Sequence, residues 1–240
     1  MTPDPDLSDA LAGASVDDAV LALRPDYRAL LIVVSGARGG PTDEVSDAAL
    51  QRAEERARGR LDGAVPESLP EIAAWREAFL GFGVKPRAAR SSVEALLRRV
   101  DAGLPRINRL TDLYNAVSVE HLLPIGGEDL DGYAGPPRLV RATGDEPFDT
   151  VADGQPVTVT AEPGEAVWRD DLGVTCRRWN WRQCVRTRLG DQTSNILFIL
   201  DGLQPVSTET LEAAGAALID ALTAATPEAT AASRLLGATS

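Results

Sequence analysis

The segment from Leu104 to Asp131, LPRINRLTDLYNAVSVEHLLPIGGEDLD, constrains the fold of this chain more than any other segment. Seven polar residues alternate closely with apolar ones: Asn108, Asp112, Asn115, Ser118, His121, Glu128 and Asp129. A buried polar group without a hydrogen bond destabilises a fold, so polar side chains set this tightly among core residues must be paired. The segment therefore predicts either a buried structural network or the wall of a site.

The pattern of apolar residues, turn residues and helix caps predicts helices before strands. Branched apolar residues at 29–34 predict one early buried strand. The expected helices cover residues 6–23, 43–60, 71–82, 91–101, 110–120 and 207–226, and the later strands cover 139–142, 156–161, 166–169 and 197–200. The tail from Glu228 is expected to be frayed.

This order of elements predicts an α+β fold. Residues 71–123 should be mainly helical and 137–200 mainly strand, so that helices of the N-terminal half pack on a mostly antiparallel or mixed β-sheet of the C-terminal half. The 240 residues are expected to form a single domain, with 1–70 as an N-terminal extension and the helix at 207–226 packed on it.

The charge balance restricts the expected partners. Thirty-six acidic and 24 basic residues give a net charge of −12, which argues against DNA and against tight, sequence-independent RNA binding. Arginines still gather at 87–109 and 177–188, so a local basic face remains open. No apolar run is long enough to span a membrane, and the acidic N-terminus is no secretory signal. A cytoplasmic location is therefore expected.

The scarcity of histidine removes whole classes of site. His121 is the only histidine, no Cys-x-x-Cys or G-x-S-x-G occurs, and we expect no metal and no cofactor. Glu128, Asp129 and Asp131 in GGEDLDG could bind a cation, although a solvated turn is favoured for Asp131. Cys176 and Cys184 are expected to be reduced, partly buried thiols.

The stretch CRRWNWRQCVRT at 176–187 alternates tryptophan with polar residues. On a strand, Trp179 and Trp181 would share one face, and Asn180 and Arg182 the other. Such faces could stack a base and clamp a carboxylate or phosphate. Alternatively, the tryptophans belong to the core and the arginines are solvated.

Three stretches, TDLYNAVS, LPIGGEDLD and LVRATGDEPF, resemble the editing module, or B3/B4 domain, of the phenylalanyl-tRNA synthetase beta subunit. The resemblance covers about residues 75–200. The positions that match the family pattern are Thr111, Asp112, Asn115, Pro124, Asp129, Arg141, Ala142 and Glu146. Gly126 stands where the family has a pocket histidine, a place that His121 could take, and the tryptophans and arginines of 176–187 replace a Gly-rich stretch that lines the family's pocket.

The resemblance implies a free-standing B3/B4-like domain that hydrolyses the ester of a mischarged aminoacyl-tRNA through a positioned water. Two alternatives are a non-catalytic module that binds an amino acid or tRNA, and a step of biosynthesis that uses aminoacyl-tRNA. The expected partner is thus aminoacyl-tRNA or a free amino acid, and the oligomeric state is left open.

The candidate site residues follow from the resemblance and from the polar residues in apolar frames. Catalytic roles are expected for Asn115, Asp129 and His121, and substrate-binding roles for Asp112, Gly126, Glu128, Trp179, Asn180, Trp181, Arg182 and Gln183. We expect Asn115, Asp129 and residues 180–183 to converge on one concavity, because pockets gather convergent polar groups.

Overall fold

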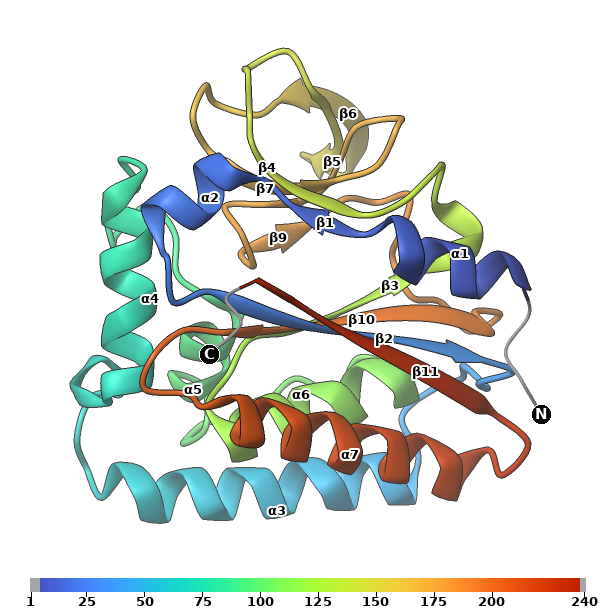
Figure 1. Cartoon of the computed structure of the whole chain (residues 1–240). Helices are drawn as coiled ribbons and strands as arrows, with labels where there is room; N and C mark the ends of the chain where they lie inside the picture. The colour runs from blue at the N-terminus through green and yellow to red at the C-terminus, as the bar shows by residue number, and fades with distance from the viewer. Residues whose placement is uncertain (1–4, 238–240) are drawn as a thin grey trace.

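The computed structural model describes residues 5–237 and shows an α+β fold, as predicted (Figure 1). The helices are α1 (Pro5–Gly13), α2 (Asp18–Leu23), α3 (Glu44–Leu61), α4 (Pro70–Gly81), α5 (Ser92–Leu97), α6 (Arg109–His121) and α7 (Thr208–Ala225), with short 3-10 turns η1 (Pro66–Ser68) and η2 (Leu130–Gly132). None of the helices within residues 5–237 has the length and apolar character needed to cross a membrane.

A four-stranded antiparallel sheet forms the centre of the molecule. Its order is β11 (Thr230–Gly237), β2 (Arg28–Ser35), β10 (Asn195–Gly202) and β3 (Ile125–Asp129). The segment expected to be an extension therefore supplies an internal strand, β2. The predicted frayed tail was wrong, because β11 pairs with β2 from Thr230 opposite Ser35 to Gly237 opposite Arg28. Backbone hydrogen bonds to an existing strand order a sequence whose composition alone does not indicate a strand.

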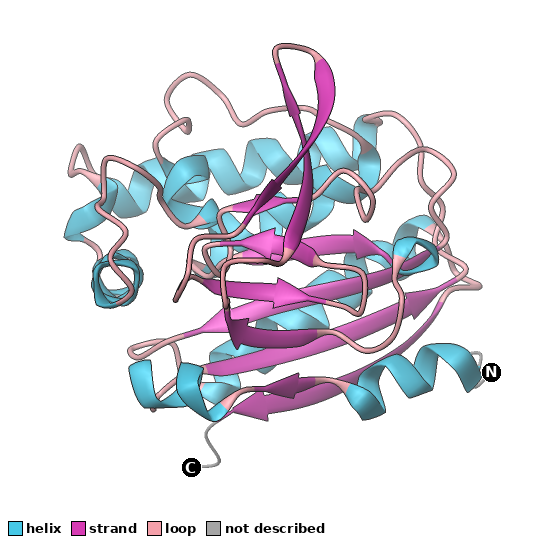
Figure 2. Ribbon diagram, turned by 90° about the horizontal axis from the view of Figure 1, so that it is seen from above, coloured by secondary structure: helices cyan, strands magenta, loops and turns pink. Residues whose placement is uncertain are grey.

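A second, five-stranded sheet has the order β1 (Ser15–Val16), β4 (Arg138–Arg141), β7 (Ala166–Arg169), β8 (Val174–Arg177) and β9 (Arg182–Gln183). A separate hairpin of β5 (Pro147–Ala152) and β6 (Gln155–Thr160) projects from the body, as Figure 2 shows. The single helix expected at 6–23 is instead two helices separated by β1, because the chain there pairs in parallel with β4.

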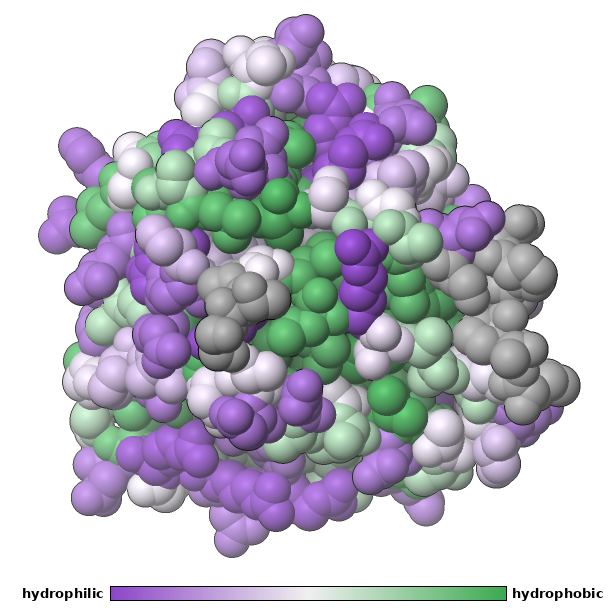
Figure 3. Space-filling model, in the orientation of Figure 1, coloured by the Kyte–Doolittle hydropathy of each residue, from purple (hydrophilic) through white to green (hydrophobic). Residues whose placement is uncertain are grey.

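The two sheets and the helices form layers around two main cores. Strand β2 is buried on both faces, so its alternate residues serve different cores. Leu31 packs with Trp168 between the two sheets. Ile32 packs with Leu113 and Leu218 on the other side, where α6 and α7 cover the four-stranded sheet. Helix α3 packs outside α6, and Figure 3 shows hydrophilic residues along the lower edge of the molecule, over α3.

Two predicted N-caps are present, at the starts of α5 and α7. The Ser91 side chain accepts a hydrogen bond from Glu94 N, as the sequence pattern predicted. Helix α5 is nevertheless shorter than expected and ends at Leu97, with turns following toward Gly103. Ser207 accepts from Thr210 N at the start of α7.

Candidate functional site

A cavity of about 320 Å³ lies between the two sheets and is walled by α5 and α6. The four-stranded sheet contributes Ile125, Gly126, Glu128, Ile199 and Asp201. The five-stranded sheet and its β8–β9 turn contribute Trp168, Cys176, Trp179, Asn180, Trp181, Arg182 and Gln183. The helical side contributes Ser92, Ala95, Leu96, Arg99, Pro105, Ile107, Thr111, Tyr114 and Asn115.

Strand register explains why two carboxyl groups face this cavity. Glu128 lies opposite Leu197 and Gly126 opposite Ile199 in the β3–β10 pair. Alternate residues of a strand share a face, so Asp201, two residues beyond Ile199, points the same way as Glu128. Gly126 lies between the two carboxyl positions along the strand direction, and its missing side chain leaves room between them.

Glu128 is buried, with 1% of its surface exposed, and its carboxylate accepts a hydrogen bond from the Tyr133 hydroxyl. Burial raises the pKa of Glu128 to about 7, while hydrogen bonds from Tyr133, Thr175 and Thr187 oppose part of the rise. Burial also raises the pKa of Tyr133 well above its ordinary value, so its hydroxyl remains a donor. Glu128 can therefore exchange a proton near neutral pH.

Asp201 forms a second buried carboxyl group on the same floor. It accepts hydrogen bonds from the Tyr27 hydroxyl at 2.5 Å and from Asn180 Nδ2 at 3.2 Å. Burial raises its pKa to about 7, with the Glu128 charge adding to the rise and the donors Tyr27 and Asn180 opposing it. Asp201 is not among the site residues expected from the sequence. The signal for it is an acidic residue at the end of the apolar run ILFIL.

The β8–β9 turn interrupts the alternation that a continuous strand through 176–187 would have. Arg178 and Trp179 have φ values of 49° and 67°, in the left-handed region, so the chain reverses there. Trp179 is fully buried, with its ring centroid 4.9 Å from that of Tyr27 and 5.5 Å from that of Trp75, whereas Trp181 is only half-buried at the mouth of the cavity. The two tryptophans therefore do not share a strand face. Core packing of Trp179 holds a backbone conformation that is otherwise costly.

Asn180 joins the turn to both sides of the cavity. Its carbonyl oxygen accepts from Ser92 N at 3.1 Å, and its side-chain Nδ2 donates to Asp201. Asn180 Oδ1 and Ser92 Oγ are buried and have no hydrogen-bond partner among residues 5–237. Buried polar atoms are normally paired, so these two atoms are available to a ligand or a water molecule in the cavity.

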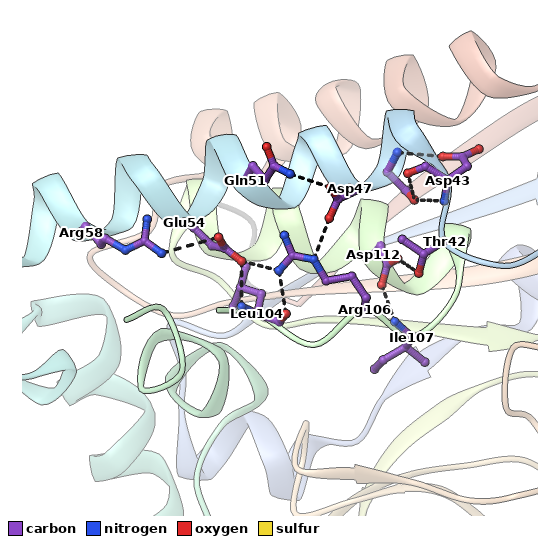
Figure 4. Close-up of polar contacts among 11 residues, drawn as sticks. Thr42, Asp43, Asp47, Gln51, Glu54, Arg58, Leu104, Arg106, Ile107 and Asp112 are labelled. Carbon is purple, nitrogen blue, oxygen red and sulfur yellow. Dashed lines mark hydrogen bonds and ion pairs between the residues drawn. The ribbon is translucent and has the colours of Figure 1, made fainter. Parts of the chain in front are cut away.

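Several predicted residues meet here, and others lie elsewhere. Asn115 lines the cavity from α6, one helical turn after Thr111, together with Gly126, Glu128 and residues 179–183. Asp112 does not line it. Its carboxylate accepts from Thr42 Oγ1 at 2.6 Å and from Ile107 N at 2.8 Å, and so joins the loop before α6 to the start of α3, as Figure 4 shows.

The expected catalytic residues Asp129 and His121 also lie outside the cavity. Asp129 follows Glu128 on β3, so its side chain faces the other side of the strand and accepts from Thr193 Oγ1 at 2.5 Å and Asp131 N at 3.0 Å. His121 ends α6 in a separate hollow with Arg60 and Glu71, and does not take the place that Gly126 leaves. Partial burial lowers the pKa of His121 below its ordinary value.

The carboxylates of GGEDLDG do not converge on a cation site. Glu128 faces the cavity, whereas the Asp131 carboxylate accepts from Asn195 Nδ2 at 3.0 Å on the outside. Within the part of the chain that the structure describes, no three His, Cys, Asp or Glu side chains are grouped to hold a metal ion. Cys176 and Cys184 are both free and buried.

Comparison with known proteins places this architecture in a family. The family model described as the B3/4 domain matches residues 74–215. Among solved structures, an N-terminal fragment of the phenylalanyl-tRNA synthetase beta-subunit from Pyrococcus horikoshii is similar, with a TM-score of 0.46 and 15% sequence identity. The match covers 93% of this chain and 50% of that one, so the chain spans half the length of the fragment. No curated protein matches the chain.

The matched residues include α5, α6, both sheets' cavity-lining strands and the β8–β9 turn. They make up more than half of the 240 residues, and the resemblance in the sequence is thereby confirmed. The chain belongs to the B3/4 domain family.

Proposed function

We propose that this domain binds the aminoacyl end of a mischarged aminoacyl-tRNA in the cavity and hydrolyses its ester bond. Family membership supports the substrate class. The observation that carries the chemistry is Glu128, a buried carboxyl group in the cavity with a pKa of about 7. A general base works best when its pKa lies near the working pH, which is the condition that burial creates here.

In the proposed reaction, the Glu128 carboxylate accepts a proton from a water molecule as the water oxygen attacks the ester carbonyl carbon. The tetrahedral intermediate collapses, the bond to the ribose oxygen breaks, and that oxygen takes up the proton. Side-chain donors on the helical wall, Asn115 Nδ2 and Ser92 Oγ, are available to stabilise the negative charge on the carbonyl oxygen. Burial raises the pKa of Cys176 well above its ordinary value, so its thiol stays protonated and is a poor nucleophile.

The test is to incubate the protein with a panel of aminoacyl-tRNAs, each carrying a different radiolabelled amino acid, and to follow the release of free amino acid. We expect a subset of the esters to be hydrolysed faster than in buffer. A protein that leaves every ester at its spontaneous rate would refute the hydrolase.

A second candidate is a non-catalytic module for a free amino acid. The arrangement of charge favours it, because carboxyl groups form the floor of the cavity while Arg99 and Arg182 lie at the mouth. These groups could pair with the α-ammonium and α-carboxylate of an amino acid. Saturable binding of a free amino acid by calorimetry, without ester hydrolysis, would select this candidate.

Filling the space at Gly126 should abolish binding without unfolding the protein. Gly126 does not have a positive φ, and a Cβ there would meet only the flexible amide Nε2 of Gln183, at 3.2 Å. We therefore expect Gly126→Val to block ester hydrolysis and amino-acid binding while the melting temperature changes little. Gly127→Ala is the matched control. Its Cβ would lie 2.9 Å from both Leu189 Cδ1 and Phe198 Cε1 in the core, so it should lower stability by about 1–3 kcal/mol and leave the cavity open.

Substitutions at Asn115 and Asp129 should have different effects, one on the rate of hydrolysis and the other on stability, although both residues match the family pattern. Asn115→Ala removes a cavity donor and should slow ester hydrolysis about 10²-fold with little change in stability. Asp129→Ala leaves the Thr193 hydroxyl without its acceptor and should lower the free energy of unfolding by about 1–3 kcal/mol, while the folded protein keeps its activity. Rates and urea unfolding of the two variants check this. Equal loss of activity in both would contradict the assignment.

A further inference from the structure

The mouth of the cavity carries an aromatic ring fixed by two guanidinium groups. The Arg178 and Arg182 Cζ atoms lie 4.3 Å and 4.5 Å from the centroid of the Trp181 ring. Arg178 Nη1 also donates to Ala88 O at 3.3 Å, which ties this arrangement to the loop before α5. Trp181 packs against the core between the sheets but remains only half-buried. The result is a positioned, partly exposed planar surface of indole and guanidinium.

Two arginines at the mouth have no acidic or hydrogen-bonding partner among the described residues, although Arg182 also stacks on Trp181. Arg99, in the turn that follows α5, and Arg182 on β9 line the cavity and are exposed. Neither side chain forms a hydrogen bond or ion pair with any side chain or backbone group that the structure describes. Nearby arginines behave differently, since Arg76 and Arg98 both bind the Glu94 carboxylate. In a chain with a net charge of −12, two unpaired cations at one opening are complementary to an anionic ligand.

We propose that Trp181, Arg182 and Arg99 bind the single-stranded 3′ end of tRNA, with a terminal base stacked on the Trp181–Arg182 surface and phosphates paired with the two arginines. The assignment rests on the proposed function, since it takes aminoacyl-tRNA as the ligand. Proteins that bind single-stranded nucleic acid combine aromatic or guanidinium stacking surfaces with cations that contact phosphates. A free amino acid offers one carboxylate and would use the arginines without the stacking surface.

The separation of charge between mouth and floor orients the ligand. Glu128 and Asp201 lie on the buried floor, where a phosphate would be repelled and desolvated. The nucleotide end therefore stays at the mouth, and the aminoacyl group, which carries a cationic ammonium, enters the cavity. The ester between them then lies next to the wall that holds Asn115.

Binding to a defined RNA tests the proposal. The probe is an RNA minihelix that ends in a single-stranded ACCA, compared with a blunt minihelix of the same stem, by fluorescence anisotropy over a range of salt concentrations. We expect the ACCA probe to bind more tightly than the blunt one. Arg182→Ala and Arg99→Ala should each reduce the slope of log affinity against log salt by about 0.7, the value for one phosphate contact on a single strand. Trp181→Ala should weaken binding on the order of 10- to 100-fold, and Trp181→Phe should retain most of it.

Arg52 supplies the matched control, because it is an exposed arginine of α3 that does not line the cavity. Arg52→Ala removes the same charge and should leave binding and salt slope unchanged. Equal binding of blunt and ACCA probes, or an equal effect of Arg52→Ala and Arg182→Ala, would overturn the proposal. Circular dichroism of Trp181→Ala shows whether its fold survives, and the exposed Arg182→Ala variant carries the test if it does not.

Kinetics on the aminoacylated minihelix distinguish this proposal from the proposed function. The mouth variants should raise KM and leave kcat unchanged, since they act on the nucleotide and not on the ester. A wild-type protein that binds the ACCA probe through these residues but releases no amino acid would refute hydrolysis and support binding of the tRNA 3′ end at the mouth. If the ester is hydrolysed and the mouth variants have the wild-type KM, binding of the tRNA 3′ end at the mouth would be refuted and hydrolysis supported.

Discussion

Replacing Glu128 with glutamine should lower the rate constant of ester hydrolysis by about 10²–10⁴, the usual contribution of a general base. Glutamine has nearly the shape of glutamate and can still accept the hydrogen bond from the Tyr133 hydroxyl, so the fold and substrate binding should survive. It cannot accept a proton from water. The measurement is single-turnover release of amino acid from the best ester of the panel, with KM determined in parallel.

The pH dependence makes this expectation specific. Because the pKa of Glu128 is about 7, the wild-type rate should rise with pH up to about 7 and then level off. Glu128→Gln should lose this dependence. Tyr133→Phe is the matched control, because it removes a donor that opposes the raised pKa, and it should move the rise to higher pH without abolishing activity. A Glu128→Gln variant with the wild-type rate and pH profile would exclude Glu128 as the base.

Sequence reasoning located one wall of the cavity well because that wall is local. Asn115 and Thr111 lie on one helix with clear periodicity, and Gly126 and Glu128 lie two residues apart on the following strand. A single segment therefore contained most of the chemistry on this side. The resemblance to the family added the expectation that these residues surround a pocket.

The errors have a common physical cause, which is that long-range contacts decide what the local pattern leaves open. The direction of Asp129 depends on strand alternation next to Glu128, and the role of Asp112 depends on Thr42, seventy residues away. The turn at Arg178 and Trp179 depends on the packing of Trp179 against Tyr27 and cannot be read from alternation of residue types. Strand β11 exists because β2 offers it an edge.

Asp201 illustrates what a single sequence does not reveal. It follows the apolar residues of β10. Its carboxylate accepts hydrogen bonds from Tyr27, which immediately precedes β2, and from Asn180 in the β8–β9 turn. These three residues come from parts of the chain separated by 174 and 21 residues. Only the assembled sheets show that the cavity floor carries two buried carboxyl groups and that burial raises the pKa of each.

The two buried carboxyl groups should make the protein less stable as pH rises from 5 to 8. The pKa values of Glu128 and Asp201 are raised from 4.5 and 3.8 to about 7 in the folded state. Between about pH 4 and pH 7 the folded chain therefore binds more protons than the unfolded chain, so the free energy of unfolding falls with increasing pH. At 1.36 kcal/mol per pH unit and proton, each group should cost about 3–4 kcal/mol across this window.

Other shifted groups do not reverse this expectation. Carboxyl groups with lowered pKa values, such as Glu94 and Asp170, stabilise the fold above their unfolded pKa values and lose that effect only in acid, below the window. The lowered pKa of His121 acts in the opposite direction, because stability from this group rises as pH increases through its ordinary value. It is a single, half-buried group opposed by two fully buried ones.

Urea unfolding at pH 5, 6, 7 and 8 measures the effect, with Glu128→Gln and Asp201→Asn as matched variants. Each substitution removes one titrating group and should remove about half of the pH dependence, and the double variant should have a nearly flat profile. The Glu128 charge contributes to the raised pKa of Asp201, so the two single effects should sum to more than the double effect. A wild-type protein whose stability rises from pH 5 to pH 8, or variants that keep the full slope, would show that the carboxyl groups on the cavity floor stay ionised.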